Sequence, residues 1–434
     1  MTLLVISPDY ASHLLPLATL ATAWRDAGER VVVATGRATD PIVREFGLER
    51  HDLPLGRGSN ARVIRAEDQP EGESDSLRGF FEATRRGMVP TLSYQARERL
   101  TDLMWDPVDA GRRTLAAVAA VQPDAIIVDH LAFSARLALQ TARIPYADVV
   151  LGHPSALPVL GEVYGYPPFW PAAFSPAPEE LAELRALCDE VSARFTAEWN
   201  RTARTLDPAA PLTADAFGEH GDLVLYNYPA ALAEGDGRML PPHAFLGSTR
   251  GTEAADDQVD EWMAAAGDFA YVSFGSFLSV RGDVLRRVAR ALAAIGLPAA
   301  IATGSTPPEE LGAVPDGWLV RDYLPQVRLL SAARLAVTHG GNNSVTEAIG
   351  QGVPLLVLPF STDQFAGAAA IERTGLGRAL DPNSATADEL ARALSAVRDL
   401  SGLPTLRSIA REQSERPGPQ IAYELLTARE PATS

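Results

Sequence analysis

Short runs of β-branched and aliphatic residues alternate with segments of helical spacing along most of the chain. The apolar runs predict buried parallel strands, and the intervening segments, such as residues 14–27 and 133–143, predict helices. In the first half of the chain, strands are predicted at residues 3–6, 31–34, 125–128, 146–150 and 223–226. A second run predicts strands at residues 269–273, 298–302, 318–320, 335–338 and 354–358.

Two consecutive runs of this kind predict an α/β protein with two doubly wound, Rossmann-like domains. The stretch between the runs is rich in Gly, Pro and acidic residues, which is typical of a linker. We expect an N-terminal domain over residues 1–235, a linker over 236–257 and a C-terminal domain over 258–415. The tail, 416–434, is expected to be helical and to pack back on the N-terminal domain. Residues 56–76 and 152–178 are predicted loops.

Composition narrows the possible functions. The chain has 434 residues, 46% of them hydrophobic, and a net charge of −17, which disfavours binding to nucleic acid or to an anionic membrane. It contains no lysine, which excludes a Walker P-loop and a Schiff-base lysine. Its one cysteine, Cys188, cannot form an intrachain disulfide or a cysteine metal cluster. No signal-peptide pattern or membrane-length apolar stretch is present, so we expect a soluble, cytoplasmic protein.

The first predicted strand-to-helix turn, residues 7–13, argues against a dinucleotide site. A Rossmann fingerprint needs the pattern G-x-G-x-x-G there, and this turn contains no glycine. The chain also lacks an Asp-x-Asp pair for a metal-bound diphosphate, and its His, Asp and Glu residues show no convincing metal-ligand spacing. An NAD enzyme is therefore disfavoured, and we expect neither a metal nor a cofactor.

The segment from 322 to 380 carries the most information. Its strand at 335–338 runs into His339-Gly-Gly-Asn-Asn-Ser344, and a helix is predicted to begin near Ser344. Glycines allow close backbone approach, and the free N–H groups of a helix start attract an anion. Gly275-Ser276, after the strand at 269–273, predicts a second turn of this kind. The segment therefore predicts a diphosphate cradle without lysine or metal.

Two residues of the N-terminal half could supply a general base. His13 lies in the first strand-to-helix turn, and imidazole has a pKa suited to deprotonating a hydroxyl near neutral pH. Asp129 ends the strand at 125–128 and would share its edge with His13, where a carboxylate can orient the ring. As alternatives, His13 is a histidine that only stabilises its turn, and Asp129 is the N-cap of the next helix.

The order and spacing of several motifs resemble the family 1 nucleotide-sugar-dependent glycosyltransferases, which have the GT-B architecture of two Rossmann-like domains facing across a cleft. The motifs are His-x-x-Pro at 13–16, Ser-Phe-Gly-Ser at 273–276, Leu-Pro-Gln at 324–326, His-Gly-Gly-x-Asn-Ser at 339–344, Glu347, Gly-Val-Pro at 352–354 and Asp-Gln at 363–364. The sequence departs from the family at Ser12, where Gly is frequent, at Gly367, where Asn is usual, and at the Asn342–Asn343 pair.

The resemblance implies a role for each matching residue. His13 would be the catalytic base and Asp129 its partner, in a single displacement that inverts the anomeric carbon without metal. Asp363 and Gln364 would bind hydroxyls of the transferred sugar, although they could also only cap the next helix. The remaining donor-binding residues would contact the base (Tyr323, Leu324, Gln326), the ribose (Glu347) and the diphosphate (Ser276, His339, Gly341, Asn343, Ser344).

The expected function is transfer of a hexose, from a UDP-sugar in preference to a dTDP-sugar, to a hydroxyl of a small hydrophobic acceptor. Aromatic residues in the N-terminal loops suit a natural-product aglycone, as in antibiotic biosynthesis and other secondary metabolism. The acceptor is expected to contact Phe80, Phe81, Met88, Tyr166 and Trp170. The alternatives are a catalytically silent nucleotide-sugar-binding module and a nucleotide-sugar epimerase of the same architecture. The chain is expected to be a monomer or homodimer.

Overall fold

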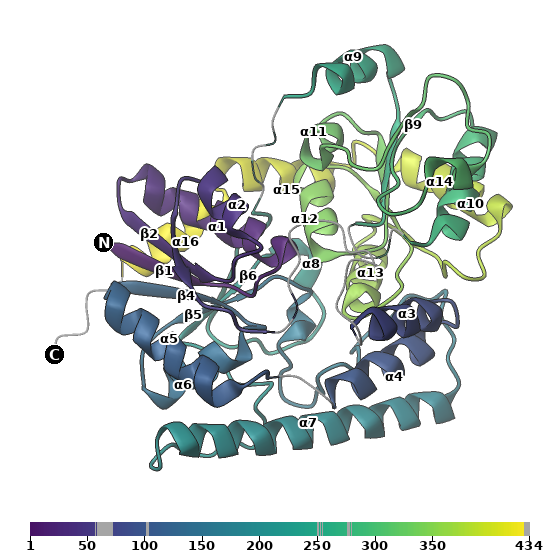
Figure 1. Cartoon of the computed structure of the whole chain (residues 1–434). Helices are drawn as coiled ribbons and strands as arrows, with labels where there is room; N and C mark the ends of the chain where they lie inside the picture. Colours follow the sequence, from purple (N-terminus) through teal and green to yellow (C-terminus); the bar gives the residue numbers. More distant parts are fainter. Residues whose placement is uncertain are drawn as a thin grey trace.

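The computed structural model describes residues 1–56, 58, 73–100, 104–249, 251, 253, 255–275, 278 and 280–428. These residues form two lobes, each built on a parallel sheet flanked by helices, as Figure 1 shows. The N-terminal sheet has seven strands in the order β3-β2-β1-β4-β5-β6-β7, and the C-terminal sheet has six in the order β10-β9-β8-β11-β12-β13. The predicted fold class, two doubly wound α/β domains, is therefore confirmed.

The N-terminal lobe contains the first seven strands and the first eight helices of the described chain. Its strands are β1 (Thr2–Ile6), β2 (Arg30–Thr35), β3 (Glu49–Asp52), β4 (Ala125–Asp129), β5 (Ala147–Val150), β6 (Leu223–Tyr226) and β7 (His243–Phe245). Its α-helices are α1 (Ala11–Asp26), α2 (Asp40–Glu45), α3 (Glu73–Thr84), α4 (Met88–Arg99), α5 (Pro107–Val121), α6 (Phe133–Thr141), α7 (Pro178–Leu206) and α8 (Ala230–Ala233), with a 3-10 turn, η2, at Pro154–Ala156.

The C-terminal lobe repeats the plan. Its strands are β8 (Ala270–Ser273), β9 (Ala299–Ala302), β10 (Leu319–Arg321), β11 (Leu335–Thr338), β12 (Leu355–Val357) and β13 (Gly377–Ala379). Its helices are α9 (Asp257–Ala266), α10 (Gly282–Ala294), the 3-10 turn η3 (Pro308–Leu311), α11 (Gln326–Leu330), α12 (Asn342–Gly350), α13 (Gln364–Arg373), α14 (Ala387–Asp399) and α15 (Pro404–Glu415); α16 (Gly418–Thr427) follows. No helix in the part of the chain described here has the length and apolar character needed to cross a membrane.

The order of the strands determines where candidate functional residues lie in each sheet. In each sheet the chain turns back to the other side at one point, between β1 and β4 in the first lobe and between β8 and β11 in the second. Parallel sheets bind ligands at the carboxyl ends of the strands beside such a point. The segments that follow these four strands are those from which the sequence predicts a base and a diphosphate cradle.

Three strands, β3, β7 and β13, escape sequence-based detection. Each lies at the edge of its sheet, so it needs no continuous apolar run, and β3 reads Glu-Arg-His-Asp. Strand β7 pairs with β6, so the predicted linker over 236–257 contains a strand of the N-terminal sheet. The other domain boundaries remain predictions, and most of the predicted loop 56–76 falls outside the described residues.

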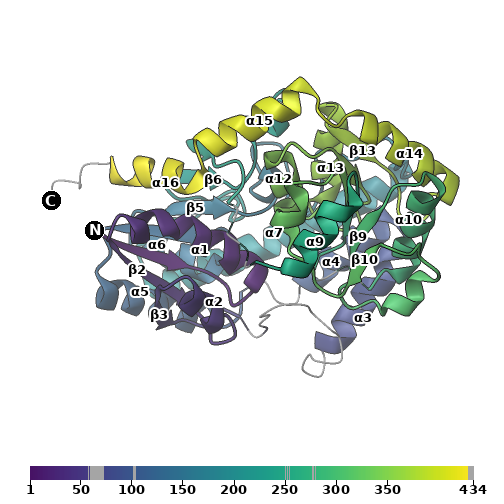
Figure 2. The ribbon, with the colours of Figure 1, turned by 90° about the horizontal axis from the view of Figure 1, so that it is seen from above.

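Two connecting segments of the described chain run between the lobes, and these two segments contact each other. The first follows β7, and the second runs from α15 to α16, which returns to the N-terminal lobe and packs on α1 (Figure 2). The Trp24 and Tyr423 rings meet edge to face at 5.2 Å, and the Tyr423 hydroxyl donates to Glu29. At the crossings, a Cβ on Gly418 would lie 2.7 Å from the carbonyl oxygen of Leu246. This close approach brings the two connections together at one place.

A buried ion pair between α6 and β5 lies next to the end of β4. Arg136 of α6 and Asp148 of β5 are both fully buried, with 2.8 Å between Nε and Oδ1. Arg136 also donates to the carbonyl of His130, next to Asp129, and Asp148 accepts from the backbone N–H of Gly221. The pair therefore links α6 to the strand ends at the base of the candidate site.

We predict that Arg136→Ala lowers the free energy of unfolding by about 3–5 kcal/mol, because it leaves the Asp148 carboxylate buried without its partner. Chemical denaturation measures this loss. The matched control is Arg30→Ala, which breaks an exposed pair with Glu49 and is expected to change stability far less. Equal losses in the two variants would contradict the role given to Arg136.

Candidate active site

The side chains of His13 and Asp129 meet at the switch point of the N-terminal sheet. His13 lies in the first turn of α1, which begins at Ala11, so it is inside the helix and not in the preceding turn as expected. Its Nδ1 is 2.6 Å from Oδ2 of Asp129, which ends β4 and is fully buried. The other carboxylate oxygen of Asp129 accepts from the backbone N–H of Leu131. This arrangement fixes the ring and leaves Nε2 free of Asp129.

Electrostatics prepare His13 to take a proton. Burial acts to lower the pKa of His13, but the facing carboxylate of Asp129, with a smaller contribution from Asp363, raises it above its ordinary value of 6.5. Burial would raise the pKa of Asp129, but His13 holds it below the usual range. The pair therefore favours an ionised aspartate beside a histidine that accepts a proton readily.

A pocket opens beside this pair. It is bounded by residues adjacent to His13 and Asp129 in the sequence and by the segment after β3: Pro8, Asp9, Tyr10, His13, Leu55, Gly56, Gly58, Leu131, Ala132, Phe133 and Ser134. Its lining combines apolar side chains with the imidazole. Sequence reasoning missed this pocket because its lining comes from short segments far apart in the chain; their positions after β1, β3 and β4 were the available signal.

The five residues expected to contact an acceptor lie elsewhere. Phe80 is 6% exposed and packs among residues of the C-terminal lobe, with Phe81 against the same cluster. Met88 is 4% exposed and lies in the apolar cluster around α7. Tyr166 and Trp170, half-buried and edge to face at 6.5 Å, pack on that cluster. Phe80 and Met88 are thus buried in apolar clusters, and contact of these five residues with an acceptor stays a prediction.

In the C-terminal lobe, His339 follows β11 and sits between two glycines. A Cβ on Gly275 would lie 2.8 Å from its Cε1, and one on Gly341 would lie 2.4 Å from its Nε2. Gly340 adopts φ +86°, which other residues rarely reach, and Gly341 is the N-cap of α12. Burial lowers the pKa of His339 to about 4, so the ring is neutral near pH 7. The glycines thus hold an uncharged imidazole against the start of α12.

A second group of polar residues surrounds Gln326 at the start of α11. Its Nε2 donates to Glu347 at 2.6 Å, and its Oε1 accepts from the Ser344 and Tyr271 hydroxyls at 3.3 and 3.4 Å. This network fixes the Glu347 carboxylate one turn into α12.

The residues that precede Gln326 differ in exposure. Tyr323 is 68% exposed, whereas Leu324 is 3% exposed. The ring of Tyr323 is therefore largely exposed and the side chain of Leu324 is buried, and their contact with a nucleotide base stays a prediction.

Asn343 and Asp363 reach across to the N-terminal lobe. Asn343 Nδ2 donates to the carbonyl of Ser12 at 3.2 Å, directly beside His13. The Asp363 carboxylate accepts from the backbone N–H of His153 at 2.6 Å. These contacts place the start of α12 and the start of α13 opposite His13, with the backbone N–H of His153 as the partner of Asp363.

Gln364 and Ser276 complete the expected donor residues. Gln364 is 7% exposed, and its amide bonds the backbone N–H groups of Phe360 and Ser361 and the Ser361 hydroxyl. It stabilises the turn that carries Asp363. Ser276 lies outside the described residues. A Cβ on Gly367 would meet open space, so the missing asparagine there leaves room beside this turn.

Comparisons with known proteins agree with this arrangement. Residues 236–404 match the family described as UDP-glucoronosyl and UDP-glucosyl transferase. Oleandomycin glycosyltransferase from Streptomyces antibioticus is 31% identical over 224 residues, which are 50% of this chain and 51% of that relative. The chain thus spans about half the length of this curated relative.

Solved structures extend the likeness to the whole fold. The glycotransferase of kitacinnamycin superposes with a TM-score of 0.67 at 22% identity, covering 98% of both chains. The spinosyn rhamnosyltransferase SpnG complexed with thymidine diphosphate gives 0.64 at 20% identity, covering 98% of this chain and 100% of that one.

The two Rossmann-like lobes with facing sites therefore have the GT-B fold. The match of residues 236–404 to this transferase family and the similarity to oleandomycin glycosyltransferase agree with the resemblance seen in the motifs.

We predict that the imidazole of His13 titrates above pH 6.5 and that Asp129→Asn moves its pKa below that value. Without the carboxylate, burial is the larger remaining influence and disfavours the charged ring. NMR titration of the histidine Cε1 protons measures both values. His339, whose low pKa arises from burial alone, is the internal control and should not move. An unchanged His13 pKa in the variant would contradict the assigned coupling.

Proposed function

We propose that this chain is an inverting, metal-independent glycosyltransferase that transfers a hexose from a nucleoside-diphosphate sugar to a hydroxyl of a hydrophobic acceptor. The carrying observation is the juxtaposition of the two lobes at one point. His13, paired with Asp129, lies beside Ser12, whose carbonyl contacts Asn343 at the start of α12. A base and an anion-binding helix start thus face each other across the interlobe boundary.

The reaction is a single in-line displacement. His13 Nε2 takes the hydroxyl proton of the acceptor as its oxygen attacks the anomeric carbon, and the bond from that carbon to the diphosphate oxygen breaks. Asp129 stabilises the resulting imidazolium. Attack opposite the leaving group inverts the anomeric configuration.

The leaving diphosphate needs stabilisation that does not depend on lysine. The N–H groups at the start of α12 would bind it, and the helix dipole would add a favourable potential. His339 and Ser344 add hydrogen-bond donors from neighbouring positions. Because these are oriented dipoles of the protein, a chain with a net charge of −17 can still hold an anion locally.

The donor is proposed to be a UDP-sugar in preference to a dTDP-sugar. Glu347, fixed by Gln326, is an acceptor suited to ribose hydroxyls, and only uridine carries the 2′-hydroxyl. The complex of the fold neighbour SpnG with thymidine diphosphate makes dTDP the competing donor class. Asp363 is proposed to bind sugar hydroxyls, which requires it to release or share the N–H of His153.

The acceptor is proposed to be a natural-product aglycone held in the pocket beside His13. The side chains of Tyr10, Leu55, Leu131 and Phe133 give this pocket an apolar wall. A silent binding module would have no use for the His13–Asp129 pair, which is why transfer is favoured over binding alone.

We predict that His13→Ala lowers kcat by at least about a hundredfold, because general-base catalysis contributes that much or more. Nucleotide affinity should stay within about twofold. Mass spectrometry of donor and acceptor pairs measures transfer, and NMR of the product should show an inverted anomeric centre. Full activity in the variant would remove His13 from the mechanism, and an epimerised sugar formed from donor alone would favour the epimerase.

We predict that the chain binds UDP and that Glu347→Ala weakens this binding about tenfold, the expected cost of losing a hydrogen bond to a charged group. Affinity for dTDP should fall less. Isothermal calorimetry with both nucleotides measures these changes. Glu190→Ala, on the exposed face of α7, is the control and should bind as the wild type does. Failure of both nucleotides to bind the wild-type chain would overturn the proposed function.

A further inference from the structure

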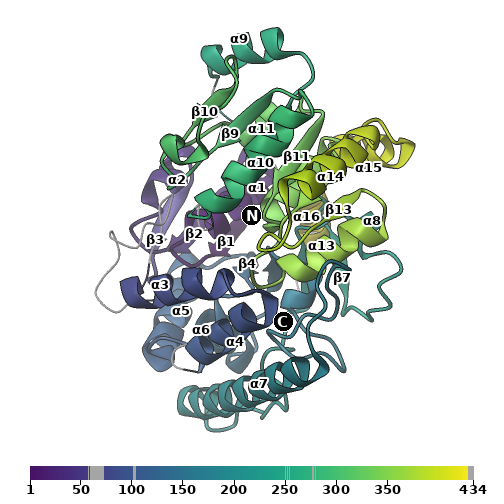
Figure 3. The same cartoon turned by 90° about the vertical axis from the view of Figure 1, so that its right-hand side faces the viewer.

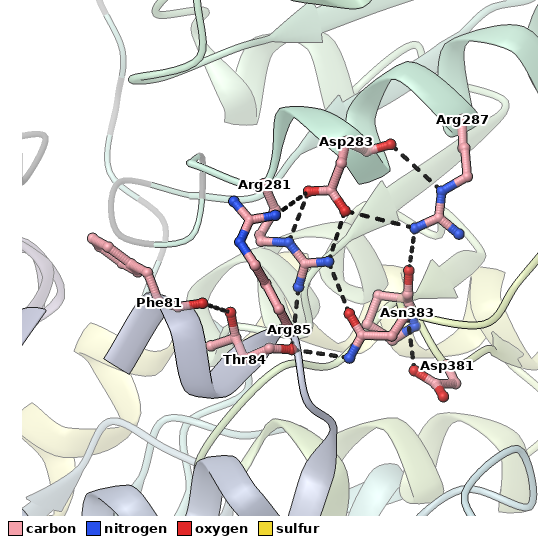
Figure 4. Close-up of polar contacts among 9 residues, drawn as sticks. Phe81, Thr84, Arg85, Arg281, Asp283, Arg287, Asp381 and Asn383 are labelled. Atoms are coloured by element: carbon pink, nitrogen blue, oxygen red, sulfur yellow. Dashed lines mark hydrogen bonds and ion pairs between the residues drawn. The ribbon is translucent and has the colours of Figure 1, made fainter. Parts of the chain in front are cut away.

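A polar cluster at the end of α3 joins the lobes at a second place, away from His13. Helix α3 belongs to the N-terminal part of the chain but lies against the C-terminal lobe (Figures 1 and 3). Figure 4 shows the contacts between Thr84 at its end and residues near α10 and α14. The proposed reaction uses none of these residues.

The carbonyl of Thr84 is the centre of the contact. It accepts from Arg281 Nη1 at 3.2 Å and from Asn383 Nδ2 at 2.9 Å. The last carbonyls of a helix lack partners within it and carry partial negative charge. Two side chains of the C-terminal lobe therefore satisfy the end of α3.

Arg281 is 1% exposed, and its guanidinium is fully engaged. Its Nε and Nη2 donate to the two carboxylate oxygens of Asp283 at 2.8 Å each, and Nη2 also donates to Asn383 Oδ1 at 2.8 Å. A planar guanidinium suits such simultaneous contacts, which an ammonium cannot reproduce. Arg281 thus ties α3 to the N-terminus of α10 and to the connection before α14.

The same guanidinium touches a donor-side turn. Its Cζ lies 4.9 Å from the ring centroid of Phe360, which packs edge to face on Phe274 at 5.5 Å. Phe360 donates its N–H to Gln364, in the turn that presents Asp363. Phe274 precedes Gly275, which contacts His339. Arg281 therefore contacts one donor-side segment directly and the other through Phe360.

Apolar packing reinforces the connection. Phe80, one turn before the end of α3, is buried in the cluster that also contains Phe274, Leu278 and Phe360. An exposed ion pair between Arg85 and Asp283 lies at the rim, at 3.2 Å. Docking of α3 thus buries an aromatic ring and satisfies a carbonyl at the same surface.

We infer that Arg281 is a positioning residue that couples the docking of α3 to the geometry of the nucleotide-sugar site. The inference rests on the proposed function. When α3 is docked, Thr84 and Phe80 complete the surroundings of Arg281 and hold Phe360 and Phe274 in place. If α3 separates, the buried guanidinium loses a partner, and both donor-side segments lose their support. Because coupling is reciprocal, nucleotide binding favours the docked helix to the same extent.

The test is nucleotide affinity measured by calorimetry with UDP and dTDP in the full-length chain. Arg281→Met keeps side-chain volume but removes every donor, and it should weaken binding of the preferred nucleotide about tenfold. Asn383→Ala, which removes one of the two donors to Thr84, should weaken it about threefold. Arg281→Lys should not restore wild-type affinity, because lysine cannot make the forked contacts.

Arg85→Ala is the matched control, since it breaks an exposed pair with the same Asp283 and should change affinity less than about twofold. Thermal unfolding of each variant checks the fold. The discriminating measurement is a double-mutant cycle between Phe80→Ala and Arg281→Met on nucleotide affinity. If α3 acts through Arg281, the two effects combine to less than their sum.

Three results would contradict the coupling between α3 and the nucleotide-sugar site. Unchanged affinity in Arg281→Met and Asn383→Ala, or fully additive effects in the cycle, would overturn the coupling while leaving the proposed function intact. Lower thermal stability with wild-type affinity would show a purely structural role and would also overturn it. Failure of the wild-type chain to bind either nucleotide would overturn the proposed function and this inference with it.

Discussion

The 2.6 Å hydrogen bond between His13 and Asp129 depends on β1 and β4 being direct neighbours in a parallel sheet. Their register pairs Ile6 with Val128, so the chain continues from both strand ends at the same height. The buried pair of Arg136 and Asp148 holds that edge from beneath. The contact between His13 and Asp129 therefore depends on the pairing of two apolar strands, β1 and β4, which are buried in the centre of the sheet.

In the second lobe, too, two directly paired parallel strands bring polar segments together. Strands β8 and β11 are neighbours, and the segments that follow them bring Gly275 against His339. One lobe thus presents a proton acceptor held by a carboxylate, and the other presents N–H groups at a helix start. The two lobes are in contact through Asn343 and Asp363, which bond the backbone of Ser12 and of His153.

The sequence is informative where function depends on residues adjacent to buried strands. Strands β1, β4, β8 and β11 are continuous apolar runs, and His13, Asp129 and His339 follow or end them. Edge strands such as β3 are polar and were missed. The contact of Arg281 with Thr84 was also beyond sequence reasoning, because it joins a side chain to a backbone carbonyl 197 positions away. The burial of Phe80 is also beyond sequence reasoning, since aromatic type alone does not separate a buried ring from an exposed one.

The closeness of Leu246 and Gly418 has a mechanical consequence. Because the two connections meet there, a rotation of one lobe against the other about this point would displace neither connection far. Helices α15 and α16 lie at one edge of the molecule and α3 at the opposite edge, as Figure 2 shows. Contacts at the end of α3, far from that point, would therefore resist such a rotation with a long lever arm.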